Sequence, residues 1–389
     1  MSVTQLRIVA CVQHPTSRQL SQREKSRSTV RLCHGAEPGL PFATLTAERA
    51  QRTPRAIRIL PIVDEAVTDP GDSELHHYRL FGGVLASDVE IPELERVQPG
   101  PATWSLYSAV GSPAESNGEE LGSDVVTGDV RVRLYRQPAG FRLVFDDTGC
   151  FDISAAGDRI SWTHQADVSM RNARADLTSR VLAAALHAAG TVCLHGSAVV
   201  ASGQAFGFLA PKFHGKSTLA LALVRSGAKL LTDDTLPVMP GATPLACPGL
   251  HATRLWADSA ARVGIGSAHE SKEGEKMLFS SLPPEHVTHD ASPLTALYLL
   301  APTRTPQDGA VVWRTRLSPI ESTLSLIGHA KLASLLTRSE APVLFRAATA
   351  LTAAVPVYRL NVVRDLERLP EVIDTIRSWH SRDQAAVSR

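Results

Sequence analysis

The chain has 389 residues, 43% of them apolar and 20% charged, and its formal net charge is +1. This composition is typical of folded globular proteins and leaves room for two domains and an extension. The near-zero charge gives no reason to expect a nucleic-acid partner, and no apolar run is long enough for membrane insertion. Five cysteines without a CxxC pair argue against a disulfide framework or zinc site and favour a cytoplasmic protein.

The N-terminal stretch differs from the rest of the chain in charge. Within residues 1–58, nine Arg and one Lys face only three Glu, and Ser, Thr, Gln and Pro are frequent. Such a stretch buries little apolar surface, so we predict a basic, disordered extension over residues 1–75. The alternatives are a basic arm for nucleic acid or an acidic partner, or translated sequence upstream of the true start.

Residues 76–168 are predicted to form a small antiparallel β-rich domain. Short alternating segments, separated by Gly, Pro and Asp, are found at 130–136, 141–146, 150–154 and 159–163. Residues 112–128 contain Gly, Ser, Glu and Asn with few apolar residues, which predicts a loop.

Residues 169–389 are predicted to form an α/β domain, because apolar runs alternate with helical periodicity. A helix is expected over 169–190. Strands are expected at 192–201, 205–209, 228–232, 296–301, 311–317 and 356–362. Further helices are expected at 218–225, 320–337, 341–354 and 365–380.

A phosphate-binding loop is predicted where an apolar strand leads into Gly-Lys-Ser-Thr and a helix. Such a loop needs backbone N–H groups at a helix N-terminus, a lysine for the phosphates and a hydroxyl for Mg²⁺. We therefore predict ATP and Mg²⁺ as cofactors. The expected nucleotide contacts are Ala210, Lys212, His214, Gly215, Lys216, Ser217 and Thr218.

The loop departs from the usual pattern at its first position, where Ala210 replaces glycine. Alanine fits there if φ is negative or if strain of about 1 kcal/mol is tolerated. Lys212 and His214 would add positive charge around the phosphates. The alternative is a coincidental Gly-Lys-Ser-Thr at a helix start, because Ser and Thr are good N-caps.

Two acids, Asp233 and Asp234, end an apolar strand shortly after the loop helix. In a parallel sheet the carboxyl ends of neighbouring strands converge on one crevice. One acid can then bind Mg²⁺ while the other accepts a proton from an attacking hydroxyl. We assign Ser217 and Asp234 to the metal and Asp233 to the proton. A solvated Asp-Asp turn is the alternative.

These motifs together resemble a known family. Leu194-His195-Gly196-Ser197-Ala198-Val199, the Gly-Lys-Ser-Thr loop and Leu-Leu-Thr-Asp-Asp resemble the catalytic domain of HPr kinase/phosphorylase. The likeness is closer to bacterial relatives encoded beside peptide-modification and polysaccharide-export genes. It covers about residues 78 to 280. It implies a P-loop kinase-like fold of the HPr kinase/phosphoenolpyruvate carboxykinase type, preceded by a small β-rich domain.

The resemblance implies an ATP- and Mg²⁺-dependent phosphotransferase that acts on a serine or threonine hydroxyl of a peptide or small protein, and homo-oligomers are compatible with it. It implies catalytic roles for His195, Asp233 and Asp234. Arg254, which lies downstream of the acids, would neutralise phosphate charge. The family's glycines at positions 210 and 213 are Ala and Phe here, and its Glu-x-Arg-Gly segment is absent. Phosphorolysis and recognition of HPr itself are therefore not expected.

Four alternatives remain at this stage. One is that His195 is a buried histidine that caps a strand and has no catalytic role, and another is that Arg254 forms a surface salt bridge. The chain as a whole is a nucleotide-binding regulatory module without phosphotransfer, or a scaffold that binds no nucleotide.

Overall fold

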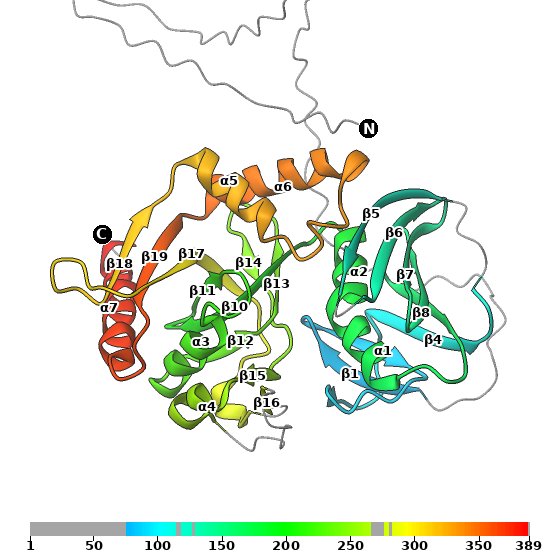
Figure 1. The fold of residues 1–389 in the computed structure, drawn as a ribbon, viewed down its shortest axis with the longest axis horizontal. Coiled ribbons are helices and arrows are strands. Elements are labelled where there is room, and N and C mark those ends of the chain that lie inside the picture. Colours follow the sequence, from blue (N-terminus) through cyan, green and yellow to red (C-terminus); the bar gives the residue numbers. More distant parts are fainter. Residues whose placement is uncertain (1–74, 114–117, 127–128, 266–275, 280–281, 388–389) are drawn as a thin grey trace, which may run out of the picture. The chain divides into compact units, whose positions relative to one another are not determined.

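The computed structural model describes residues 75–387, except 114–117, 127–128, 266–275 and 280–281 (Figure 1). The predicted extension, residues 1–75, lies outside the described residues apart from residue 75. In the part of the chain that is described, no helix has both the length and the apolar character needed to cross a membrane.

The first sheet has nine strands in the order β3-β1-β2-β4-β9-β8-β7-β6-β5. The strands are β1 (His76–Leu80), β2 (Gly83–Ser87), β3 (Glu95–Arg96), β4 (Trp104–Val110), β5 (Glu119–Val125), β6 (Arg131–Gln137), β7 (Gly140–Phe145), β8 (Gly149–Ser154) and β9 (Arg159–His164). In β6 the apolar residues Val132 and Leu134 are buried and alternate with arginines, as the sequence pattern predicts.

Two expectations for this sheet need correction. It is not purely antiparallel, because β4 pairs in parallel with both β2 and β9. The loop expected at 112–128 contains the strand β5, whose polar residues pair with β6 at the sheet edge. An edge strand with one paired side can be polar, so its composition resembled that of a loop.

A helical segment covers the apolar face of this sheet. It consists of α1 (Met170–Asp176), one π-helical stretch (Leu177–Val181) and α2 (Leu182–Ala188). Ser169 caps its start by accepting a hydrogen bond from the backbone N–H of Asn172. The buried face of the segment shares one hydrophobic core with sheet residues such as Leu143 and Phe151. From the sequence, this segment was expected to belong to the α/β domain of residues 169–389. Its buried side chains instead pack against the nine-stranded sheet.

The second sheet has eight strands and is mixed, with the path β11-β10-β13-β14-β17-β19-β18 and β12 paired to β10. The strands are β10 (Val192–Ala201), β11 (Gln204–Leu209), β12 (Lys229–Thr232), β13 (Thr235–Met239), β14 (Leu245–Ala246), β17 (Ser292–Thr303), β18 (Val312–Arg316) and β19 (Val357–Val363). A separate pair consists of β15 (Thr253–Leu255) and β16 (Met277–Phe279).

Helices cover both faces of the second sheet. They are α3 (Lys216–Arg225), α4 (Ala257–Val263), α5 (Pro319–Gly328), α6 (Ala341–Ala354) and α7 (Leu369–Val387), with single 3₁₀ turns at Pro284–His286 and Arg338–Glu340. Alternate residues of β11 enter different cores: Phe206 and Phe208 pack with α3 and α7, whereas Ala205 and Leu209 pack with α5 and α6. A sheet buried on both faces explains the continuous apolar runs in the sequence.

The position of strand β10 between two other strands determines which side chains lie at the candidate site. It lies between β11 and β12 and is antiparallel to both. Gly196 is opposite Leu209, at the end of β11, and Ala198 is opposite Thr232, at the end of β12. Residues 196–198 of β10 lie between these two ends, so the carboxyl ends of β11 and β12 meet on either side of an antiparallel strand and not as direct neighbours. This places His195 and Ser197 beside the acids.

Candidate functional site

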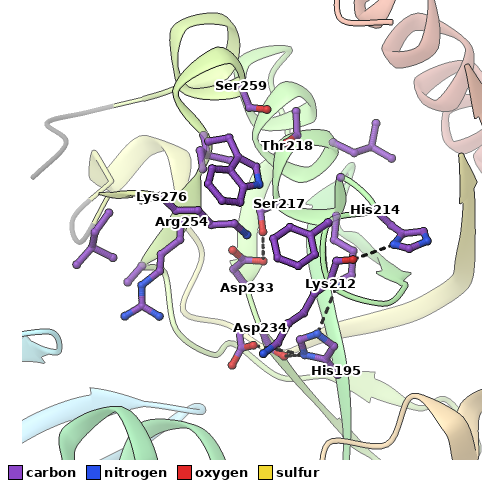
Figure 2. Close-up of a pocket in the computed structure, with 18 of the residues that line it drawn as sticks. His195, Lys212, His214, Ser217, Thr218, Asp233, Asp234, Arg254, Ser259 and Lys276 are labelled. Carbon is purple, nitrogen blue, oxygen red and sulfur yellow. Dashed lines mark hydrogen bonds and ion pairs between the residues drawn. The ribbon is translucent and has the colours of Figure 1, made fainter. Parts of the chain in front are cut away.

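The predicted phosphate loop connects the end of β11 to the start of α3. Gly215 is the N-cap of α3 with a left-handed φ of 89°, and open space surrounds the position that a Cβ would take. The first N–H groups of any helix lack intrahelical partners and carry partial positive charge. Gly215, Lys216, Ser217 and Thr218 line a cleft of about 1430 Å³, and Figure 2 shows Ser217 and Thr218 at its wall.

Ala210 and Phe213, two residues of the loop, differ in their backbone conformation. Ala210 is buried and does not have a positive φ, so alanine causes no left-handed strain there. Phe213 has a φ of 69°, a conformation that costs a side-chain-bearing residue about 1–2 kcal/mol. The backbone strain that the sequence suggested for Ala210 is found instead at Phe213.

Lys216 is the buried cation of the loop, with only 8% of its surface exposed. Its Nζ donates hydrogen bonds to the carbonyl oxygens of Ala210 (2.8 Å) and Pro211 (3.2 Å), and it lies 3.3 Å from Nε2 of His195. Burial lowers the pKa of Lys216, and the carboxylates of Asp233 and Asp234 oppose this shift. The ammonium is thus held beside the acids by neutral acceptors.

Asp233 is a buried carboxylate that accepts hydrogen bonds from three hydroxyl groups. Oδ1 accepts from Ser197 and, over 3.0 Å, from Ser217, and Oδ2 accepts from Thr253 over 2.5 Å. Because a buried charge is costly unless it is hydrogen-bonded, these donors explain how Asp233 can be 5% exposed. Ser217 bonds to Asp233, and not to Asp234, with which the sequence analysis had grouped it.

Asp234 lies beside Asp233 but in a different environment. Its side chain is 45% exposed, its φ is 70°, and it accepts a 2.5 Å ion-paired hydrogen bond from Nζ of Lys331. Burial would raise the pKa of Asp234, but the Lys331 ammonium and the His195 ring outweigh it and hold that pKa well below its usual range. Asp234 is therefore an ionised carboxylate at the cleft surface.

His195 connects Lys216 to Asp234, and Figure 2 shows its ring beside Asp234. Its Nδ1 lies 3.1 Å from the backbone oxygen of Asp234 and 3.3 Å from that residue's Oδ1. Nδ1 therefore faces two oxygens of Asp234, while Nε2 on the other side of the ring faces the Lys216 ammonium. This position places His195 in the site, whereas strand capping was the alternative.

The other predicted residues lie around the same cleft. Lys212 and His214 are exposed on the loop, where the ring of His214 contacts the carbonyl oxygen of Lys212 at 2.9 Å. Arg254 is exposed on β15 and lines the cleft, and no ion pair joins it to another described residue. Of the predicted nucleotide contacts, only Ala210 does not line the cleft.

Three residues of the site were missed by sequence reasoning. Ser197 could have been found, because it lies two residues after His195 on a strand and so faces the same side. Thr253 and Lys331 carry no motif. Lys331 is 8% exposed and follows α5, almost a hundred positions after the acid that it contacts.

The donor atoms fit a magnesium ion better than a softer metal. In the described part of the chain, no group of three or more His, Cys, Asp or Glu side chains could hold a metal ion. Mg²⁺ is usually held by one or two carboxylates together with water and phosphate oxygens, and Ser217 and Asp233 offer a hydroxyl and a carboxylate side by side.

Comparison with known proteins gives limited guidance. No protein-family model matches the chain, and no curated protein matches it. Among solved structures, the Hpr(Ser) kinase/phosphatase from Coxiella burnetii is similar, with 14% identity and a TM-score of 0.29 over 50% of this chain and 98% of that chain. At this TM-score the likeness says nothing of activity, so the function has to be inferred from the chain's own residues.

Proposed function

We propose that the chain binds ATP with Mg²⁺ in the cleft and transfers the γ-phosphate to a serine or threonine hydroxyl of a peptide or small protein. The main support is the hydrogen bond between Ser217 and Asp233. It joins the first turn of α3 to the end of β12, next to a buried lysine and a second carboxylate. This combination of groups is what phosphoryl transfer requires.

In this proposal Ser217 and Asp233 hold the metal ion. The Ser217 hydroxyl already donates a hydrogen bond to the Asp233 carboxylate, and both residues line the cleft. When bound, Mg²⁺ would neutralise charge on the β- and γ-phosphate oxygens. This reverses the sequence-based roles of the two acids, in which Asp234 was the metal ligand.

Lys216 and the first N–H groups of α3 hold the phosphates. The Lys216 ammonium donates to two loop carbonyls, which are neutral acceptors. A phosphate oxygen carries negative charge, and charge-assisted hydrogen bonds are roughly twice as strong as neutral ones. We therefore expect Lys216 to exchange these carbonyls for the nucleotide.

Asp234 accepts the proton of the attacking hydroxyl. Three hydroxyl donors already occupy Asp233, whereas Asp234 is half-exposed to the cleft. Lys331 and His195 contact the Asp234 carboxylate and fix its orientation. The lowered pKa makes Asp234 a weak base but keeps it ionised, so it accepts a hydrogen bond from the attacking hydroxyl and takes its proton only as the bond to phosphorus forms. Arg254 faces the same cleft and would balance the phosphate charge.

Matched variants of the two acids test this division of roles. Asp234→Asn should lower phosphate transfer to Ser- and Thr-containing peptides by about 10²- to 10⁴-fold, the usual worth of a general base, while Mg·ATP affinity stays within about tenfold. Asp233→Asn should weaken the magnesium-dependent part of ATP binding. The opposite pattern would restore the sequence-based assignment.

A regulatory module that binds nucleotide without phosphotransfer is the second candidate. The left-handed Phe213 supports it, because a strained, bulky residue occupies a position where the related family has glycine. Magnesium-dependent ATP binding without transfer to any peptide tested, and without ATP turnover, would favour this candidate.

A further inference from the structure

Two exposed aromatic side chains stack against each other in the cleft. Phe213 is 59% exposed and Trp256 is 39% exposed. Their ring centroids are 5.9 Å apart with an angle of 24° between the planes, and both residues line the same cleft as the phosphate loop. Large aromatic side chains are normally buried, so an exposed pair inside a cleft indicates a surface for a ligand.

A cation lies over both rings. Nζ of Lys276 is 5.4 Å from the centroid of Phe213 and 5.5 Å from that of Trp256. Figure 2 shows Lys276 on the same side of the cleft as Arg254. A cation in this position is attracted by the ring faces and is close enough to the loop to meet a negative group. The cluster therefore offers flat apolar surface and positive charge together.

The backbone places this cluster next to the phosphate loop. Phe213 is two residues before Gly215, the N-cap of α3, and Trp256 is the N-cap of α4. Nη2 of Arg364 also donates to the carbonyl oxygen of Phe213, over 3.4 Å. Because the base of a nucleotide is joined to its phosphates through a single ribose, a ring surface this near the loop is within reach of the base.

We infer that Phe213 and Trp256 form a stacking platform for the nucleobase of the nucleotide whose phosphates Lys216 holds. This inference rests on the proposed function. It assigns a role to Phe213, which has a left-handed backbone and whose exposed side chain lines the cleft. The Lys276 ammonium would stay near the ribose and phosphates.

Stacking recognises the face of a base and tolerates its identity, because every base has a π-face. The platform therefore predicts that ATP and GTP bind with affinities within about tenfold of each other. It also predicts that inorganic tripolyphosphate, which has the charge but no base, binds more weakly than ATP.

The experiment is calorimetry with Mg·ATP and with Mg·tripolyphosphate on the full chain and on Trp256 variants. Trp256→Ala should weaken Mg·ATP binding by about 5- to 150-fold, the worth of one base–aromatic stack. Mg·tripolyphosphate binding should stay within about twofold, because it has nothing to stack. Trp256→Phe is the matched control, and it should recover most of the lost ATP affinity.

Tryptophan fluorescence gives a second readout on the same proteins. ATP should change the emission of the wild type and not that of Trp256→Phe, and tripolyphosphate should change neither. Equal wild-type affinity for ATP and tripolyphosphate would overturn the platform while leaving the phosphate site in place. An equal loss of affinity for ATP and for tripolyphosphate in Trp256→Ala would also overturn the platform. If the wild type binds neither ligand, the proposed function itself fails.

Discussion

The hydroxyl of Ser217 donates a 3.0 Å hydrogen bond to Oδ1 of Asp233, sixteen residues further along the chain. It connects the start of α3 to the end of β12, the two elements whose ends form the cleft wall. Ser197 and Thr253 donate to the same carboxylate, so its position is fixed from three sides. A metal ion bound between Ser217 and Asp233 would contact oxygens whose positions these hydrogen bonds already fix.

Ser217→Ala should weaken binding of ATP in the presence of Mg²⁺ by about 10- to 150-fold, the range for a hydrogen bond to a charged group. ATP binding without Mg²⁺ should change little, because the backbone N–H groups and Lys216 remain. Calorimetry with and without Mg²⁺ measures the difference. Ser226→Ala is the control, since Ser226 bonds only within the last turn of α3. An equal loss in both conditions would remove Ser217 from the metal site.

Lys331→Met should lower phosphoryl transfer without lowering ATP affinity. The buried ammonium holds the Asp234 carboxylate, and its loss frees the proton acceptor to rotate. We expect a decrease of at least about tenfold, because misplacing a catalytic group costs rate far more than binding. Turnover and ATP affinity are measured on the same preparation, with Lys331→Arg as the charge-retaining control. Transfer at the wild-type rate in Lys331→Met would show that the ion pair has no role in orientation.

Asp176 makes the stability of the fold depend on pH. Burial raises its pKa to about 6 although Thr148 donates a 2.8 Å hydrogen bond to it. The folded state therefore binds more protons than the unfolded state between about pH 4 and 6, and the free energy of unfolding falls as pH rises through this window. Above about pH 6, the raised pKa of Asp176 lowers the free energy of unfolding by at most about 3 kcal/mol, which is the cost of burying its charge.

Asp176→Asn should remove this cost while keeping an acceptor for Thr148. Its melting temperature, relative to wild type, should be higher at pH 8 than at pH 4. Thermal unfolding at both pH values checks this, with the exposed Asp167→Asn as control. A variant whose melting temperature differs from that of the wild type by the same amount at both pH values would show that folding does not raise the pKa of Asp176.

The sequence predicted local features better than long-range ones. The helix expected at 341–354 is α6, and the strand–loop–helix around Lys216 is present, because periodicity and turn residues report local structure. The capping box of Ser318 and Glu321 starts α5, but this helix ends at Gly328, so the expected helix over 320–337 is too long. Turns after Gly328 place Lys331 beside the acid.

What the sequence could not predict depends on contacts between distant segments. Nothing near Lys331 indicates that it meets Asp234, and the parallel pairing of β4 is decided by strands far apart in the chain. The choice between the two acids also needed the fold. The two acids are adjacent in sequence, and the contacts with Ser197 on β10 and Ser217 on α3 distinguish Asp233 from Asp234.

Calorimetric titration of Mg·ATP into the wild type and Lys216→Ala tests the central claim most directly. Lys216 is the buried cation at the start of α3, so its loss removes the main positive charge available to the phosphates. Lys229→Ala, on the exposed start of β12, is the matched control. We predict saturable binding by the wild type and the control, and no measurable binding by Lys216→Ala. No binding by the wild type up to millimolar ATP, or undiminished binding by Lys216→Ala, would contradict a nucleotide site at this loop.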